Sequence, residues 1–352
     1  MGAPSGAFLL VLRSVDPLGA CLHHREVTNP GSALGDDRPG RRVADVGRRL
    51  RLDAATAEVV GRLAAAEVET LLLKGPSVAR WLYPDPDDRP YGDVDLLVGP
   101  GDAPAAGGVL DGLGFSRTAP DLSRSRPRAA VEWRRARDGV EIDLHETFPG
   151  VEGDLWAGLW PNHDRLEVGG REVMVPSIAG RVLLIGLHAA NHGAAARQPM
   201  ADLELALATI AEHHWAAAAT LARDVNALAA FAAGLGLCPD GAALVAALGA
   251  ETAPSVRTAV TVESPAEAVR GVALGIDWLV TRPGWRAKLA YMAEKVWPPA
   301  EWIVERYPLT SGRRFGVARA RARRLAWLAV HLPSGARAWL RARRRTRRDG
   351  EG

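Results

Sequence analysis

Cysteine and lysine are both scarce in this chain of 352 residues. The two cysteines, Cys21 and Cys238, have no metal-binding spacing and cannot form a disulfide framework. This argues against a cysteine-ligated metal protein and a disulfide-stabilised secreted domain, and we expect a cytoplasmic protein. Only three lysines occur, Lys74, Lys288 and Lys295, so arginine supplies nearly all of the positive charge.

Long hydrophobic runs are also missing from the sequence. No run reaches the roughly 18 uninterrupted apolar residues that a membrane span needs, so we expect no transmembrane segment. The short apolar stretch at residues 7–12 has no basic residue before it, so we expect no signal peptide. The hydrophobic content of 47% is that of an ordinary globular protein, and the length allows two domains.

The net charge of +3 hides an uneven distribution of charge. Residues 313–348 contain 13 arginines and no acid, which leaves 31 basic against 41 acidic residues elsewhere. This tail also alternates arginine with Trp and Leu in an amphipathic manner. It suits nucleic acid, an anionic membrane surface or an acidic partner, and it equally suits a solvated helix face.

Hydrophobic periodicity divides the chain into four parts. We expect a loose extension at 1–42, a domain of helices and strands at 43–176, a helical domain at 177–310 and the arginine-rich tail at 311–352. Within the second part we expect a helix at 43–66 and strands at 70–74 and 93–98. An Asp138-Gly139 turn then predicts a hairpin with strands at 131–134 and 140–145.

Two aspartates follow one another closely in the expected strand at 93–98. Asp93 and Asp95 are two residues apart, so they share one face of a strand. Carboxylates this close repel each other unless a cation or a shared proton lies between them. Oxygen ligands of this kind suit Mg²⁺ or Mn²⁺, although a solvated strand end with turn-capping acids explains the pair as well.

A third acid lies on the returning strand of the expected hairpin. Asp143 and His145 share a face there, with Ile142 and Leu144 packed behind them. Asp143 would complete a metal site with Asp93 and Asp95. We expect His145 to contact substrate, although a lone histidine is more often structural than catalytic.

Two histidines lie further along, in the helical part. His188 and His192 are four apart and hence on one helical face. They lack the glutamate of a zinc protease, which favours a structural or substrate-facing pair with Asp202 as its partner.

Several spaced motifs carry a family resemblance. They are Leu73-Lys74-Gly75, Tyr83-Pro84-Asp85-Pro86, Arg89-Pro90-Tyr91-Gly92-Asp93-Val94-Asp95, Glu141-Ile142-Asp143-Leu144-His145, Val175-Pro176-Ser177 and Leu187-His188-Ala189-Ala190-Asn191-His192. Over about residues 45–310 the chain resembles the uncharacterised nucleotidyltransferase family of the DNA polymerase β-like superfamily. The resemblance implies an α+β fold, with a small mixed-sheet palm followed by a mainly helical domain.

The resemblance also implies a reaction, the transfer of a nucleoside monophosphate from an NTP to an acceptor with release of pyrophosphate. Asp93 and Asp95 match the family's metal-bridging acids and Asp143 matches the third. Gly75 matches the glycine that meets the triphosphate, whereas Ser77 lies one residue beyond the usual serine position. We expect Lys74 or Arg89 to counter the charge of the pyrophosphate.

Three functions are compatible with these observations. The first is a Mg²⁺-dependent nucleotidyltransferase acting on a small molecule, a tRNA or a protein. The second is a nucleotide-binding regulator without turnover, and the third is an RNA- or membrane-associated interaction protein that acts through the arginine-rich tail. The intact set of three acids favours the first, and the acceptor leaves no motif in the sequence.

Overall fold

The structure is a computed structural model that describes residues 39–118, 129–264, 266–300, 302–303 and 316–349. Most of the expected N-terminal extension, Cys21 and the ends of the arginine-rich tail lie outside the described residues. Among the helices that are described, none combines the length and apolar character needed to cross a membrane.

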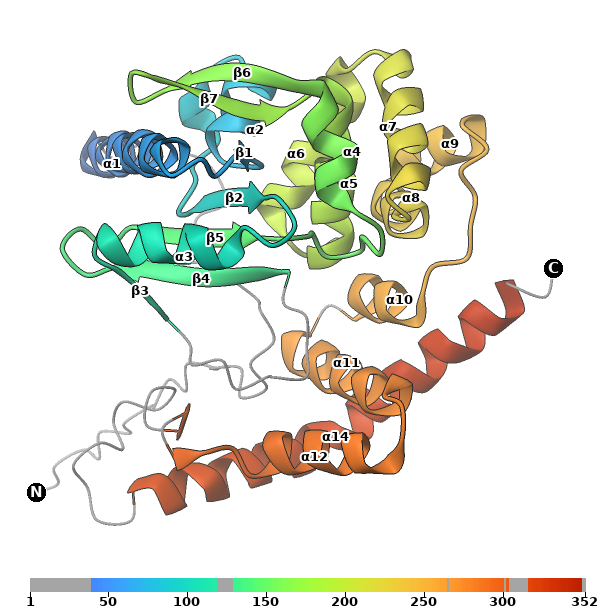
Figure 1. The fold of residues 1–352 in the computed structure, drawn as a ribbon. Helices are drawn as coiled ribbons and strands as arrows, with labels where there is room; N and C mark the ends of the chain where they lie inside the picture. Colours follow the sequence, from blue (N-terminus) through green and yellow to red (C-terminus); the bar gives the residue numbers. More distant parts are fainter. Residues whose placement is uncertain (1–38, 119–128, 265, 301, 304–315, 350–352) are drawn as a thin grey trace, which may run out of the picture.

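A five-stranded mixed sheet forms the first half of the fold (Figure 1). Its order is β1-β2-β5-β4-β3, with β1 at Thr70–Leu72, β2 at Val94–Val98, β3 at Phe115–Arg117, β4 at Ala130–Arg135 and β5 at Glu141–His145. β2 and β5 pair in parallel, whereas the other neighbours pair antiparallel. Every residue of β2 is buried, as expected for a strand inside a sheet that is covered on both faces.

One face of the sheet packs on α1 (Pro39–Ala65) and α3 (Ala103–Gly112). Alternate residues of the central strands, such as Leu96 and Ile142, join Leu63 of α1 and Leu110 of α3 in one core cluster. This alternation follows from the two-residue period of a strand. It directs the intervening residues Asp95 and Asp143 to the opposite face.

Helices cover that opposite face. They are α4 (Leu155–Leu159), α5 (Ile178–His192), α6 (Arg197–Thr209), α7 (Glu212–Asp224), α8 (Leu228–Leu235) and α9 (Pro239–Ala247). Leu71 and Leu97 of the sheet share a core cluster with Leu187 of α5 and Phe231 of α8. The candidate site therefore lies between a sheet and a helical layer.

A second, two-stranded sheet joins the two layers. β6 (His163–Val168) and β7 (Arg171–Pro176) form an antiparallel hairpin around Gly169 and Gly170, which both have positive φ angles. The short helix α2 (Pro76–Leu82) lies beside it. The expected loop at 83–90 contains one short 3-10 turn (Pro86–Asp88), which the Asp85 carboxylate caps at 2.9 Å from the Asp87 nitrogen.

The last helices form a further group, in which α10 also packs on α5 and α8: α10 (Val256–Glu263), α11 (Glu267–Thr281), α12 (Trp285–Val296) and α14 (Gly316–Asp349). Figure 1 shows α11, α12 and α14 below the sheet and its helical cover. A small core cluster that includes Ala273 and Trp339 joins α11 to α14, and the indole of Trp339 donates to Asp277 over 3.2 Å. The expected fold class, a mixed sheet followed by a mainly helical part, is confirmed.

Candidate active site

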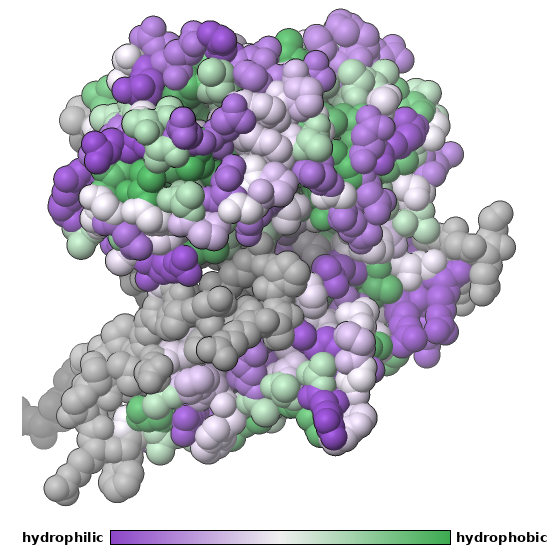
Figure 2. All heavy atoms as spheres, in the orientation of Figure 1, coloured by the Kyte–Doolittle hydropathy of each residue, from purple (hydrophilic) through white to green (hydrophobic). Residues whose placement is uncertain are grey.

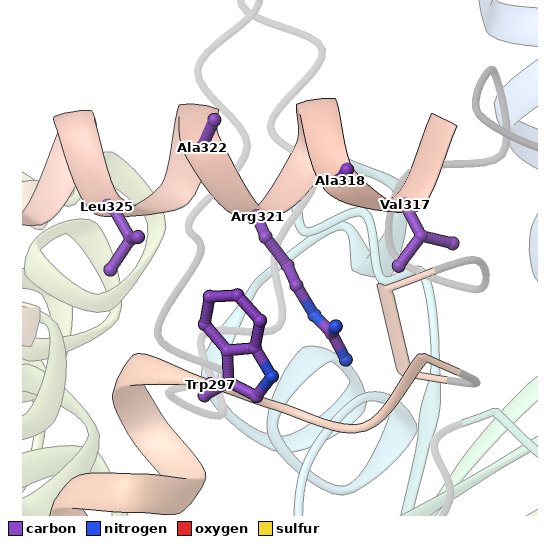
Figure 3. A pocket seen from close by; sticks show the side chains of 6 residues that line it. All are labelled: Trp297, Val317, Ala318, Arg321, Ala322 and Leu325. Atoms are coloured by element: carbon purple, nitrogen blue, oxygen red, sulfur yellow. The ribbon is translucent and has the colours of Figure 1, made fainter. Parts of the chain in front are cut away.

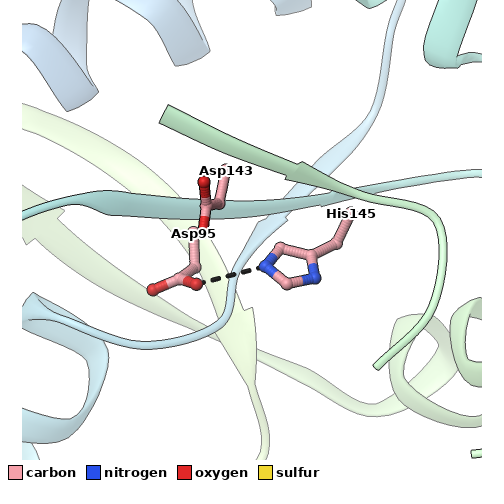
Figure 4. A group of neighbouring side chains, drawn as sticks. All are labelled: Asp95, Asp143 and His145. Carbon is pink, nitrogen blue, oxygen red and sulfur yellow. Dashed lines mark hydrogen bonds and ion pairs between the residues drawn. The ribbon is translucent and has the colours of Figure 1, made fainter. Parts of the chain in front are cut away.

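Two carboxylates meet at the centre of the sheet. The parallel pairing of β2 and β5 sets Asp95 directly opposite Asp143. Donor atoms of Asp95, Asp143 and His145 all lie within 4.8 Å of one another, and all three side chains are buried (Figure 4). Such a group of oxygen and nitrogen donors can hold a divalent cation.

Asp93 lies just before β2 begins and is half-buried. It is outside the three-residue group, although its charge acts on the same lysine as theirs. The structure thus brings Asp95 and Asp143 together with His145 and places Asp93 at the edge of that cluster. The assignment of metal-ligand roles to Asp93, Asp95 and Asp143 stays a prediction.

Lys74 supplies a positive charge to this acidic cluster. Its ammonium nitrogen lies 2.8 Å from Asp95 Oδ1, and the Asp95 side chain is only 2% exposed. Burial would lower the pKa of Lys74, but the carboxylates of Asp95 and then Asp93 raise it above its ordinary value. Burial would likewise raise the pKa of Asp95, whereas Lys74 and then His145 hold it far below its usual range.

His145 presents both ring nitrogens to oxygen atoms. Nδ1 lies 3.1 Å from the carbonyl oxygen of Thr147, and Nε2 lies 3.1 Å from Asp95 Oδ1. A carbonyl oxygen only accepts, so Nδ1 carries the proton of that bond, and Nε2 donates to Asp95 when the ring carries a second proton. Without that proton, Nε2 is a potential ligand for a cation.

Phe148 closes the apolar side of the cluster. Its ring stacks on His145 with centroids 5.8 Å apart, and the Lys74 ammonium lies 5.5 Å from its centroid. Phe148 itself belongs to the core shared with α5. Excluding water in this way strengthens the electrostatic interactions among the charged groups.

Gly75 links the lysine to helix α2. Its φ angle of +63° and ψ of −117° define a backbone conformation that favours glycine. The ring of Tyr91 lies beneath it, 3.6 Å from the position of an added Cβ atom. Ser77, in the first turn of α2, is fully buried and its hydroxyl has no hydrogen-bond partner within the described structure.

Asp53 of α1 holds the turn at Gly75 in place through Tyr91 and Arg80. It accepts a 2.6 Å hydrogen bond from the hydroxyl of Tyr91 and pairs with Arg80 of α2. Burial and then the Asp53 carboxylate raise the pKa of Tyr91, which keeps its phenol protonated as the donor. The segment from Gly75 to Asp93 is therefore anchored to α1.

Arg89 and Asp202 form a buried ion pair. Two guanidinium nitrogens of Arg89 donate to the two carboxylate oxygens of Asp202, with distances of 2.7 to 3.1 Å. Asp202 also accepts from the hydroxyl of Tyr83 at 2.7 Å and from the amide of Gln198 at 3.0 Å. This network ties the loop before β2 to helix α6.

His188 and His192 do adjoin each other on α5, with ring centroids 4.6 Å apart in an edge-to-face arrangement. The main-chain oxygen of His192 accepts from Arg270 of α11 at 2.9 Å. Asp202, which the sequence suggested as partner of the pair, has its carboxylate engaged by Arg89, Tyr83 and Gln198.

Sequence reasoning did not single out Phe148, Tyr91 or Asp53 as parts of the site. Phe148 lies three residues beyond His145, and Tyr91 lies two before Asp93. Their closeness in sequence to the expected site residues was the signal that could have identified them. Nothing in the sequence connects Asp53 to them, because that contact spans 38 residues.

Comparison with known proteins supports the same class of protein. A family model described as an uncharacterised nucleotidyltransferase matches residues 40–240, which is more than half of the chain. The mixed sheet and its acidic centre thus fall in the nucleotidyltransferase class. Within that class, the chain belongs to the uncharacterised nucleotidyltransferase family, as its motifs led us to expect.

No curated protein matches the chain. Among solved structures, it is similar to an antigenic nucleotidyltransferase-like protein from Paracoccidioides brasiliensis. The identity is 15% and the TM-score 0.32, over 53% of this chain and 93% of that chain.

Proposed function

We propose that this protein transfers a nucleoside monophosphate from an NTP to an acceptor hydroxyl or similar group and releases pyrophosphate. The observation that carries the proposal is the in-register pairing of Asp95 with Asp143 on neighbouring parallel strands. Membership of a nucleotidyltransferase family supports the reaction class. In this reaction the acceptor oxygen bonds to the α-phosphorus as the bond to the β-phosphate oxygen breaks.

The donor set fits a divalent cation. Carboxylate oxygens of Asp95 and Asp143 suit Mg²⁺ or Mn²⁺, and His145 Nε2 lies in the same group. We propose that Asp93, Asp95 and Asp143 hold the metal. When bound, such ions supply charge neutralisation at the attacking and leaving oxygens.

The chain's own residues account for the remaining steps. Asp143 takes the proton of the acceptor hydroxyl as general base. Lys74 offers an ammonium group to the triphosphate and is better placed than Arg89, because the Arg89 guanidinium is held by buried Asp202. The glycine turn at Gly75 lets the backbone approach a phosphate closely, as the family resemblance implies.

The acceptor is expected on the helical side of the site. We propose that residues 43–176 form the palm, that residues 177–310 form the helical domain, and that the two enclose the substrates. Ser77, His188 and His192 are proposed to contact substrate. Asp202 is proposed to act indirectly, through its hold on Arg89.

The test is incorporation of label from α-labelled NTPs in the presence of Mg²⁺ and a cell extract, with pyrophosphate release followed in parallel. Asp143→Asn should lower the rate by about a hundredfold to a thousandfold or more. Asp111→Asn, an exposed acid on α3, serves as the matched control and should retain full activity. Absence of transfer with every NTP, or undiminished transfer in Asp143→Asn, would sink the proposal. NTP binding without pyrophosphate release would point to a silent regulator instead.

A further inference from the structure

We propose that the C-terminal helices α12 and α14 dock this protein on an anionic lipid bilayer, lying flat in its interface. The proposal rests on a surface that we call the outer apolar stripe. It consists of Trp285, Leu289, Met292, Val296 and Trp297 from α12 and its end, and α14 adds exposed apolar side chains beside it, with Leu325 and Leu332 on one flank and Val330 on the other. None of these residues takes part in the chemistry proposed above.

Helix α12 turns its apolar face outward. Trp285, Leu289, Met292 and Val296 follow a spacing of four, three and four residues, so they lie on one side of the helix. All four are exposed, Trp285 by 67% and Leu289 by 50%. The buried Tyr291 lies on another side of the helix. An amphipathic helix ordinarily buries its apolar side, so this face has the character of a contact surface.

Helix α14 runs beside the end of α12. Arg324 is buried and donates to the carbonyl oxygen of Lys295 at the end of α12, which fixes the two helices side by side. A hollow of about 430 Å³ lies where they meet, lined by Trp297 and by Val317, Ala318, Arg321, Ala322 and Leu325 of α14 (Figure 3). Beyond Leu325, Val330 is 70% exposed.

Arginines border the apolar side chains. Helix α14 contains 11 arginines and a single acid, Asp349. Arg319, Arg323, Arg337 and Arg341 are exposed at multiples of the helical repeat and so form a row on the side of α14 that also carries Val330. Figure 2 shows hydrophobic and hydrophilic patches intermixed along the lower group of helices. Bordering arginines can reach anionic headgroups while tryptophan and leucine enter the acyl boundary.

These observations favour lipid over the other occupants that a basic surface suggests. Nucleic acid offers phosphates for the arginines and bases for tryptophan, but nothing for exposed Leu289, Val330 and Leu332. A second copy of the chain packed through this face would bring arginine rows close to one another, which costs energy. A bilayer with acidic headgroups satisfies both the apolar and the basic groups.

The position of the surface is compatible with catalysis. Figure 1 shows α12 and the first half of α14 along the lower edge of the molecule, away from the strands that carry Asp95 and Asp143. Docking there would leave the candidate site open and would hold the enzyme where a membrane-bound acceptor is concentrated.

The experiment is sedimentation of the full chain with vesicles of phosphatidylcholine alone and of phosphatidylcholine mixed with phosphatidylglycerol. We expect binding to the mixed vesicles that weakens as salt is raised. Leu289→Glu combined with Val330→Glu should reduce the partition coefficient about tenfold or more. Leu50→Glu is the matched control, because Leu50 is 59% exposed but lies on α1, and it should bind as the unaltered chain does.

A second pair of variants tests the basic row. Arg323→Gln and Arg337→Gln should each weaken binding to the mixed vesicles about fivefold. Circular dichroism and thermal melting confirm that each variant is folded, as expected for exposed positions.

Three results would overturn the proposal. They are absence of vesicle binding at low salt, binding that is unchanged by the Leu289→Glu and Val330→Glu pair, and a selective association with another partner. The last covers single-stranded RNA bound without any affinity for vesicles, and a concentration-dependent dimer that the same pair abolishes.

Discussion

Lys74 supplies positive charge next to the carboxylates of the candidate site. Its ammonium neutralises Asp95, a carboxylate that burial alone would make costly to ionise. The rarity of lysine in this chain made the residue conspicuous in the sequence, but its partner came only from the structure. The lysine precedes β2 by 20 residues, and the two meet because β1 and β2 are neighbours.

Lys74→Met should therefore destabilise the metal-free protein. It leaves Asp95 buried without its strongest countercharge, and the expected loss is about 2–3 kcal/mol of unfolding free energy, because Lys74 is itself 16% exposed. Urea denaturation in the presence of a chelator measures it. Lys288→Met, the same change on helix α12, should stay within about 0.5 kcal/mol. Equal stability of the two variants would refute the role assigned to Lys74.

Gly75 gives a second prediction at this scale. Gly75→Ala should cost about 1–3 kcal/mol, because an alanine is strained at φ +63° although its Cβ would meet nothing closer than 3.6 Å. Gly47→Ala, within helix α1, should instead stabilise by about 0.5–1 kcal/mol. Denaturation midpoints of the two variants should thus move in opposite directions, and a shift in the same direction would count against a strained turn.

At the scale of elements, an ionic cluster fastens helix α1 to the β4–β5 hairpin. The buried guanidinium of Arg135 donates to Glu58 of α1 and to Asp138 of the turn, at 2.6 and 3.0 Å. Burial would raise the pKa of each carboxyl group, but the hydrogen bonds from Arg135 lower both. The hairpin is thereby held in register against the helix that packs beneath it.

This cluster makes part of the stability depend on pH. Both carboxyl groups have a lower pKa in the folded state than their ordinary values of 4.5 and 3.8. The unfolded chain therefore binds more protons in acid, so the contribution is present above about pH 4.5 and is lost as the pH falls below it. Because both acids are partly exposed, solvent screening keeps this contribution to about 1 kcal/mol.

Arg135→Gln should flatten the acid limb of the stability curve. Urea denaturation at a series of pH values between neutrality and pH 3 would measure it. A variant whose stability falls as steeply in acid as that of the unaltered protein would disprove the assignment.

Periodicity predicted many of these elements but not how they pair. The sequence predicted helices α1 and α5 and the hairpin around Asp138-Gly139, because apolar spacing and turn residues are local properties of the sequence. The β6–β7 hairpin was not predicted, although Gly169-Gly170 between two stretches of alternating polarity is a hairpin signal. The parallel pairing that sets Asp95 opposite Asp143 depends on tertiary packing. The sequence suggested that these acids converge only through their shared chemistry and the family resemblance.

At the scale of the whole molecule, the Arg89–Asp202 pair couples the sheet to its helical cover. It joins residues 113 positions apart in sequence, and both side chains are almost fully buried. The sequence analysis assigned Arg89 to the pyrophosphate and Asp202 to the histidine pair, because nothing local shows that a loop arginine and a helix aspartate will meet.

Asp202→Asn should cost about 3–5 kcal/mol, because it leaves a buried guanidinium without its countercharge. Replacing both partners, as Arg89→Met with Asp202→Leu, should recover part of that loss. Thermal and urea unfolding of the single and double variants would give the coupling energy. Strictly additive effects would show that the pair does not join the two layers.

The Lys74–Asp95 pair also affects whether the protein can fold when divalent ions are scarce. Because the compensating charge is a covalent part of the chain, a newly made molecule can complete its core before any ion arrives. The protein is therefore expected to fold without a divalent ion. A chelator should accordingly leave the protein folded, with any fall in melting temperature limited to the linkage with the ion that it removes.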